Sequence, residues 1–272
     1  MLDFLMEPFQ YNFMLRALAV SIGIGLLCPM IGSYVVTRRL AFMGDALSHT
    51  VLPGLVLGYI VGVNPLLVAI PTCVVTAIFI GYLSKRTGLS EDTSIGIIMV
   101  GLFSLGLIMI SVHGGSNIDL EGLLLGELLG VSNQDLLIIF TICIITLTVL
   151  FFFHKELVFN SFDPEGALVI GLPSKLLDYL VLILIALAVV ASIQAVGVVL
   201  MLAMLVIPSA TAYLIARSFG SMMFMGSVIG VFVAVCGLYL SYFMDLPSGP
   251  SMALTAVLIF ILVASFNKKL AR

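Results

Sequence analysis

Charge is scarce in this sequence, and that scarcity excludes an ordinary soluble fold. Only 9% of the 272 residues are charged and 62% are hydrophobic, and the mean hydropathy is +1.29. A soluble domain of this length needs far more charge to cover its surface. The net charge of −3 is small, and no run of Lys and Arg exceeds two residues. Neither feature indicates a nucleic acid partner.

Several chemical motifs are also missing. No G-x-x-x-x-G-K-[ST] segment is present, so the chain lacks this phosphate-binding loop for ATP. The first dozen residues carry Asp3 and Glu7 where a signal peptide would be basic, so we expect the first apolar run to stay in the mature chain. No C-x-x-C pair occurs. We expect all four cysteines to be buried as small hydrophobic residues: Cys28, Cys73, Cys143 and Cys236.

What the sequence does have is a series of long apolar runs. One crossing of a hydrocarbon core about 30 Å thick takes about 20 residues. The runs lie at about 13–36, 41–62, 65–84, 95–112, 135–153, 178–194, 197–216, 221–243 and 249–267. We therefore predict an all-α fold, in which residues 1–272 form a single polytopic membrane bundle of eight or nine transmembrane helices.

The basic residues predict the orientation of these spans. Lys and Arg in short loops are retained on the cytoplasmic side. With the N-terminus outside and the C-terminus in the cytoplasm, ten of the eleven basic residues fall inside, leaving Arg16 near an outer end. If the runs within 178–216 formed one span, the orientation of every later segment would be reversed and its basic residues would lie outside. We therefore expect two spans there, or one span and a returning broken helix.

Prolines interrupt several of the predicted spans: Pro29, Pro53 followed by Gly54, Pro71 and Pro208. Each proline removes a helical hydrogen bond, which membranes tolerate where protein, water or a ligand satisfies the freed carbonyl. Kinks of this kind are common in membrane bundles. Transporters also use broken helices near their substrate sites, so we expect Pro53 and Pro208 to mark helix breaks along a pathway.

Asp45 and His49 are ionisable residues inside the second span. Their spacing of four places both on one face of a helix, and His49 would lie about 15 Å deeper than Arg38 and Arg39 at 1.5 Å per residue. A carboxylate and an imidazole suit manganese, iron or zinc. Two ligands are too few for a closed site, but a homodimer would supply four. The alternatives are a self-satisfied ion pair, or an Asp45 that caps the span.

A polar connection at about 155–177 follows the fifth span. In it, Asp163-Pro164-Glu165 predicts a helix start, because proline is accepted in the first turn and acids favour the positive end of the helix dipole. The helix would end near Gly171. It could present a compact surface to a partner, or it could be an ordinary solvated connection.

Three segments together resemble a known family. They are Gly44–Gly54, with the pattern G-D-A-x-S-H-x-V-L-P-G, then Ser161–Ala167 followed by Gly171, and Val206–Tyr213. In order and spacing they are similar to the membrane subunits of the manganese, zinc and iron ABC importer family, over essentially the whole chain. The Gly44–Gly54 segment looks more like the manganese and iron members than the zinc members.

The resemblance implies a transport subunit of the bacterial inner membrane with no enzymatic activity. It implies a homodimer, two cytoplasmic ATP-binding subunits, and an extracytoplasmic metal-binding protein that delivers a transported metal, with no permanently bound cofactor. By position, Asp45 and His49 are similar to the family's proposed metal ligands. The 155–177 connection would be the coupling helix that contacts the ATPase, with Asp163, Glu165, Ala167 and Gly171 as its motif residues.

Two other functions remain open on the residues alone. An intramembrane hydrolase could use Asp45 and His49 with Ser48 or a metal-bound water, although neither H-E-x-x-H nor G-x-S-x-G occurs. An ion-coupled carrier without an ATPase would need more charged groups along its path. We also expect an acidic outer surface that attracts cations, formed by Asp3, Glu7, Asp119, Glu121, Glu127, Asp135 and Asp245.

Overall fold

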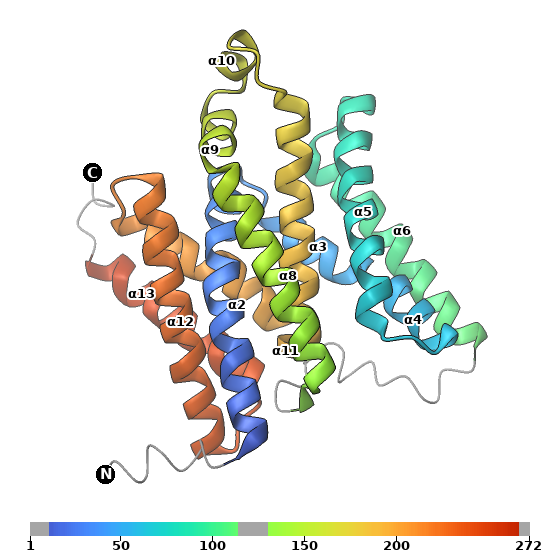
Figure 1. Cartoon of the computed structure of the whole chain (residues 1–272), viewed down its shortest axis with the longest axis vertical. Helices are drawn as coiled ribbons and strands as arrows, with labels where there is room; N and C mark the ends of the chain where they lie inside the picture. Colours follow the sequence, from blue (N-terminus) through green and yellow to red (C-terminus); the bar gives the residue numbers. More distant parts are fainter. Residues whose placement is uncertain (1–10, 114–129, 267–272) are drawn as a thin grey trace. The chain divides into compact units, whose positions relative to one another are not determined.

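A computed structural model describes residues 11–113 and 130–266, except for the side chains of residues 194–196. Within these ranges every regular element is helical, and nine helical stretches are long and apolar enough to cross a membrane (Figure 1). They are α2 (Asn12–Thr37), α3 with α4 (Ala41–Val61), α5 (Pro65–Thr87), α6 (Glu91–Val112), α8 (Asn133–Phe152), Ser174–Ile193 and Gly197–Ile215 of α11, α12 (Phe219–Met244) and α13 (Ser248–Phe266). The predicted all-α bundle is confirmed, with each span within a few residues of its expected bounds.

The chain divides into two compact units, each made of several chain segments. Among the described residues, unit 1 contains 11–36, 130–143 and 191–266, and unit 2 contains 37–113 and 144–190. In unit 1, α12 packs against α13. In unit 2, α4 packs against both α5 and α6, and α3 packs mainly against α6.

Small residues allow the helices of unit 1 to approach closely. A Cβ on Gly25 of α2 would lie 2.9 Å from the Gly230 carbonyl oxygen of α12, and a Cβ on Gly32 would overlap the Leu205 carbonyl oxygen. Small residues at such crossings let membrane helices pack by dispersion contacts. The Pro29 carbonyl in α2 accepts hydrogen bonds from Ser33 Oγ at 3.0 Å and from Ser209 Oγ at 2.9 Å, so protein groups hold this proline-containing turn.

A Gly32→Ala variant should therefore be destabilised, because its methyl group would press on the backbone of α11. Overpacking of this kind costs about 1–3 kcal/mol. The Gly96→Ala change in α6 is a matched control, since a Cβ there meets nothing within 4 Å and alanine favours a helix. Thermal unfolding in detergent should show a lower midpoint for Gly32→Ala only. Equal midpoints for the two variants would mean that this helix crossing tolerates a methyl group.

Gly197 separates the two spans that share α11 (Ser174–Ile215). Its φ of 75° and ψ of 174° are non-helical, and this conformation is open essentially only to glycine. The stretch therefore contains two spans, as expected. The helix continues through Pro208, so the break in this segment lies at Gly197 rather than at the proline.

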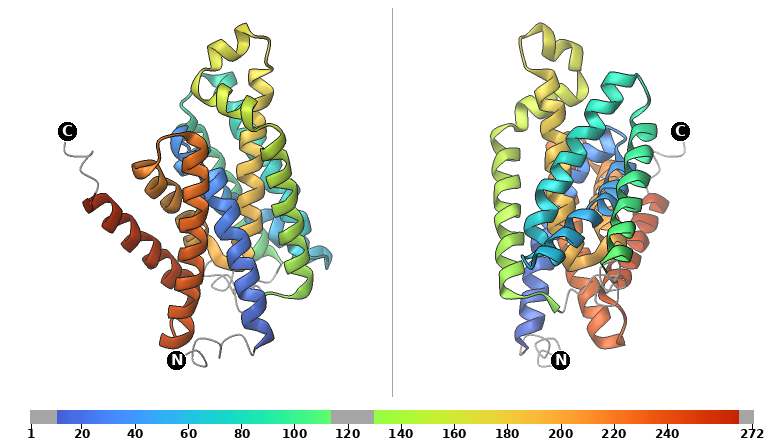
Figure 2. Two further views of the ribbon diagram at one scale, coloured as in Figure 1. Left: turned by 60° about the vertical axis from the view of Figure 1, so that its left-hand side comes forward. Right: turned by 90° about the vertical axis from the view of Figure 1, so that its right-hand side faces the viewer.

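Two short helices, α9 (His154–Phe162) and α10 (Pro164–Val169), follow α8. Asp163 caps α10 by accepting a hydrogen bond from the Gly166 amide at 2.8 Å, and Gly171 takes a φ of 84° just after the helix. The predicted helix from Asp163 to near Gly171 is confirmed. In both views of Figure 2, α9 and α10 lie beside the start of α11.

The cysteines follow the expectation with one exception. Cys28, Cys73 and Cys143 are buried, whereas Cys236 is half-buried, and all four are free thiols. They pack as small apolar side chains in their spans.

Candidate metal site

The second span is interrupted at Val51, which keeps helical backbone angles (φ −73°, ψ −18°), and this interruption follows from the sequence. α3 covers Ala41–Thr50, α4 covers Leu52–Val61, and Val51 lies between them. Pro53 is in the first turn of α4 and has no amide hydrogen, so the His49 carbonyl lacks its usual partner four residues on. Gly54 lets α4 approach α5, because a Cβ at this position would lie 2.5 Å from Thr72 Oγ1.

Asp45 and His49 lie on the same face of α3, close to this break. His49 Nε2 is 3.8 Å from Asp45 Oδ1, which is longer than a hydrogen bond. The two side chains are 24% and 30% exposed for His49 and Asp45 respectively. A carboxylate oxygen and an imidazole nitrogen therefore lie next to each other without a hydrogen bond between them, and both side chains are partly exposed at the surface of this chain.

The neighbours of this pair orient it without completing a metal site. The Phe103 ring of α6 packs edge-on against the His49 ring, with 5.3 Å between the centroids. Among the described residues, no group of three or more His, Cys, Asp or Glu side chains could hold a metal ion. One chain therefore presents only two candidate ligands here, whereas manganese, iron and zinc sites use four or more.

Ser48 is not placed to act as a nucleophile beside the pair. Its hydroxyl is buried and donates to the Asp45 carbonyl at 2.6 Å, a local bond of a helical serine. The hydroxyl therefore has a backbone partner on its own helix. This arrangement disfavours a hydrolase that uses Ser48 as its nucleophile.

A buried charge elsewhere in the bundle has a structural explanation. Asp135, placed on the outer acidic surface by the sequence, is 9% exposed and accepts hydrogen bonds from the Ser132 hydroxyl at 2.6 Å and the Ser132 amide at 3.3 Å. Ser132 Oγ in turn accepts from the Asp135 amide at 3.2 Å, which makes a reciprocal cap for α8. Asp135 thus caps a helix start, and the ion-coupled carrier gains no pathway charge from it.

The other acids of the predicted outer surface fall mostly outside the described residues. Asp3, Glu7, Asp119, Glu121 and Glu127 lie there. Asp245 is described and exposed, at the end of α12 with a φ of 51°. The acidic outer surface therefore stays a prediction.

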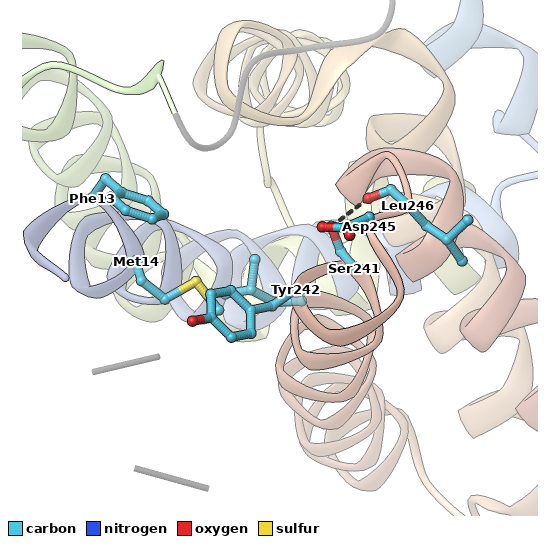
Figure 3. Close-up of a pocket in the computed structure, with 7 residues that line it drawn as sticks. Phe13, Met14, Ser241, Tyr242, Asp245 and Leu246 are labelled. Carbon is cyan, nitrogen blue, oxygen red and sulfur yellow. Dashed lines mark hydrogen bonds between the residues drawn. The ribbon is translucent and has the colours of Figure 1, made fainter. Parts of the chain in front are cut away.

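Asp245 also lines an open pocket of about 510 Å³ in unit 1, between the first turn of α2 and the end of α12 (Figure 3). Its other lining residues are mostly apolar or aromatic: Phe13, Met14, Leu238, Ser241, Tyr242 and Leu246. The Ser241 hydroxyl donates to the Leu246 carbonyl at 2.6 Å. With one carboxylate in an apolar lining, this pocket supplies no set of metal ligands comparable to Asp45 and His49.

Most of the four residues of the predicted coupling motif have a structural role in or next to α10. Asp163 caps the helix, Gly171 ends the turn after it, and Ala167 is fully buried. Glu165 is exposed. Of the four residues, Ala167 therefore has no surface for a partner to touch.

The exposed apolar surface of this region was not singled out from the sequence. Leu168, Val169 and Ile170 are 60%, 86% and 64% exposed at the end of α10. In an apolar sequence three further apolar residues carry no signal of their own.

Comparisons with known proteins agree with this architecture. The ABC 3 transport family model matches residues 10–267. The manganese transport system membrane protein MntC of Halalkalibacterium halodurans is 38% identical over 260 residues, covering 96% of this chain and 89% of that protein. The chelated iron transport system membrane protein YfeD of Yersinia pestis is 38% identical over 261 residues, covering 96% and 88%.

A solved structure has the same fold over its full length. PsaBC from Streptococcus pneumoniae in complex with Fab matches with a TM-score of 0.89 and 34% identity, covering all of both chains. Since the family model spans nearly the whole sequence and nine apolar helices are present among the described residues, this is a multi-pass protein of the bacterial inner membrane. The chain belongs to the ABC 3 transport family, as a permease of the metal type.

Proposed function

We propose that this permease imports a divalent transition metal, manganese first among them, as one half of a homodimer driven by two ATPase subunits. The observation that carries the proposal is the Asp45–His49 pair. The two groups stand 3.8 Å apart on one face of a broken helix, and both are partly exposed. Ionisable groups inside a membrane span are expensive unless they are paired, hydrated or bound to a ligand.

A second copy of the chain would complete the coordination. Two chains that meet along their α3 faces supply two carboxylates and two imidazoles, a donor set that suits manganese and iron as well as zinc. The partial exposure of both side chains in one chain supports such a shared site. Relatives described as manganese and iron transport proteins support these ions as cargo.

ATP hydrolysis belongs to separate subunits in this proposal. The exposed apolar end of α10 would dock on an ATPase in the cytoplasm, which requires the predicted orientation, with an external N-terminus. A protein outside the membrane would deliver the metal. The low charge and absent phosphate-binding loop of the sequence support this division of roles.

Uptake into proteoliposomes tests the function. The permease, reconstituted with its ATPase and supplied with the delivery protein, should accumulate manganese only when ATP is present on the ATPase side. Parallel assays with iron and zinc show which of the three metals the transporter prefers. Uptake that is independent of ATP but follows an ion gradient would favour the carrier alternative.

A further inference from the structure

A cluster of polar side chains in unit 2 is centred on the Asp178 carboxylate, in the first turns of α11. Asp178 Oδ1 accepts from Arg38 Nη1 at 3.1 Å and from Asn160 Nδ2 at 2.9 Å. Asp178 Oδ2 accepts from Lys85 Nζ at 2.8 Å. One carboxylate thus joins the α2–α3 turn, the end of α5, and α9. These three segments and the start of α11 lie toward the end of unit 2 that carries α10 (Figure 1).

Arg38 extends this cluster directly to the helix before α10. Its Nε donates to Ser161 Oγ at 2.9 Å, while Nη1 binds Asp178. The Arg38 side chain is 15% exposed. A guanidinium held at two of its nitrogens is fixed in direction as well as in position.

Arg38 is also the last side chain anchored in this cluster before α3 begins. Arg39 follows it with a φ of 61°, a left-handed conformation that turns the chain sharply, and α3 starts at Ala41. Asp45 lies in the second turn of that helix, about 6 Å along its axis at 1.5 Å per residue. The path from Arg38 to the helix that carries Asp45 and His49 is therefore short.

Two polar atoms of the cluster have no hydrogen-bond partner within the part of the protein that the structure describes. Among the described residues, Arg38 Nη2 and Asn160 Oδ1 are buried and have no hydrogen-bond partner. Buried polar atoms are nearly always paired, and an unpaired one costs free energy. Two such atoms in one network leave free donor and acceptor capacity, which a second arrangement of the same helices can use.

We propose that Asp178 is a positioning residue that couples α9 and α10 to α3, so that movement at the ATPase-facing end reorients Asp45 and His49. The inference rests on the proposed function and adds a specific joint to it. Asp178 touches neither the metal nor the ATPase. It acts through Arg38 on one side and Asn160 on the other.

An Asp178→Asn permease tests this joint in the complete transporter, with its ATPase and delivery protein in proteoliposomes. The amide keeps the shape of the carboxylate but lacks the charge that holds Arg38 and Lys85. Manganese uptake per ATP hydrolysed should fall at least tenfold, while ATP hydrolysis itself continues. Manganese binding by the detergent-solubilised variant should match that of the wild type, because Asp45 and His49 are unchanged.

Arg38→Gln should have the same effect, and the Arg38→Gln, Asp178→Asn double variant should be no worse than either single change, because all three break one joint. Asp92→Asn, which removes an exposed acid at the nearby start of α6, is the control and should keep normal coupling. If Asp178→Asn does not assemble, Arg38→Gln alone carries the prediction.

Two outcomes would overturn the joint. In one, uptake and ATP hydrolysis fall together with thermal stability, so that Asp178 is only a brace. In the other, uptake per ATP is unchanged. Both differ from failure of the proposed function, in which the wild-type transporter itself would import no metal.

Discussion

A permease that carries the Asp45→Asn substitution should assemble with its ATPase but import almost no metal. The amide keeps the shape of the side chain and removes the negative charge that offsets a divalent cation, and oxygen ligands of metal sites are normally ionised. We expect uptake to fall by about tenfold to a hundredfold, the range seen when even the residues that orient metal ligands are changed. His49→Ala removes the nitrogen ligand and should have a similar effect.

The measurement is uptake of radioactive manganese into proteoliposomes, alongside size-exclusion chromatography of the assembled complex. Ser48→Ala is the matched control on the same helix, since its hydroxyl donates to the Asp45 backbone and not to the pair. It should import close to the wild-type rate, whereas a hydrolase that used Ser48 would lose activity. Normal uptake by both Asp45→Asn and His49→Ala would show that the pair is structural.

Val169→Asp should separate the permease from its ATPase. Val169 is 86% exposed at the end of α10, and a charge would be desolvated without a partner in an apolar contact. Loss of a central apolar anchor of an interface costs about 2 kcal/mol or more, which is about thirtyfold in affinity. The loss of affinity is measured by binding of the purified ATPase subunit to the permease in detergent.

Lys175→Gln is the control for this surface, because Lys175 is exposed near the start of α11 and lies outside α10. It should bind the ATPase normally. Ala167→Phe should also weaken binding, but by distorting α10, since Ala167 is fully buried. ATPase binding that is unaffected by Val169→Asp would place the docking surface elsewhere.

The spans were predictable because lipid imposes a simple rule on the backbone. Every amide must be satisfied within the span, so an apolar run of sufficient length becomes a helix. The break at Val51 was also foreseeable from Pro53, and the cap of α10 from Asp163. The turn between the runs 178–194 and 197–216 was also expected, but the non-helical conformation of Gly197 was not, because glycine is common in membrane helices and only the backbone angles reveal it.

The local spacing of Asp45 and His49 was likewise readable, because side chains four residues apart share a helix face whatever the helix packs against. The Asp178 cluster was not. Its members, Arg38, Lys85, Asn160 and Asp178, lie far apart in the sequence. Each is a polar residue near the end of a span, which is common at a membrane boundary. Only packing brings them together.

The sequence by itself therefore determined the number of spans to within one, the interruption of the second span near Pro53 and the shared face of Asp45 and His49, since these depend on periodicity, proline chemistry and hydropathy over a few turns. The tertiary structure alone decided that Ala167 is buried while Val169 is exposed, and that Asp178 joins three other segments. Burial and long-range ion pairs depend on which helices meet, and that is set by side-chain packing across the whole unit.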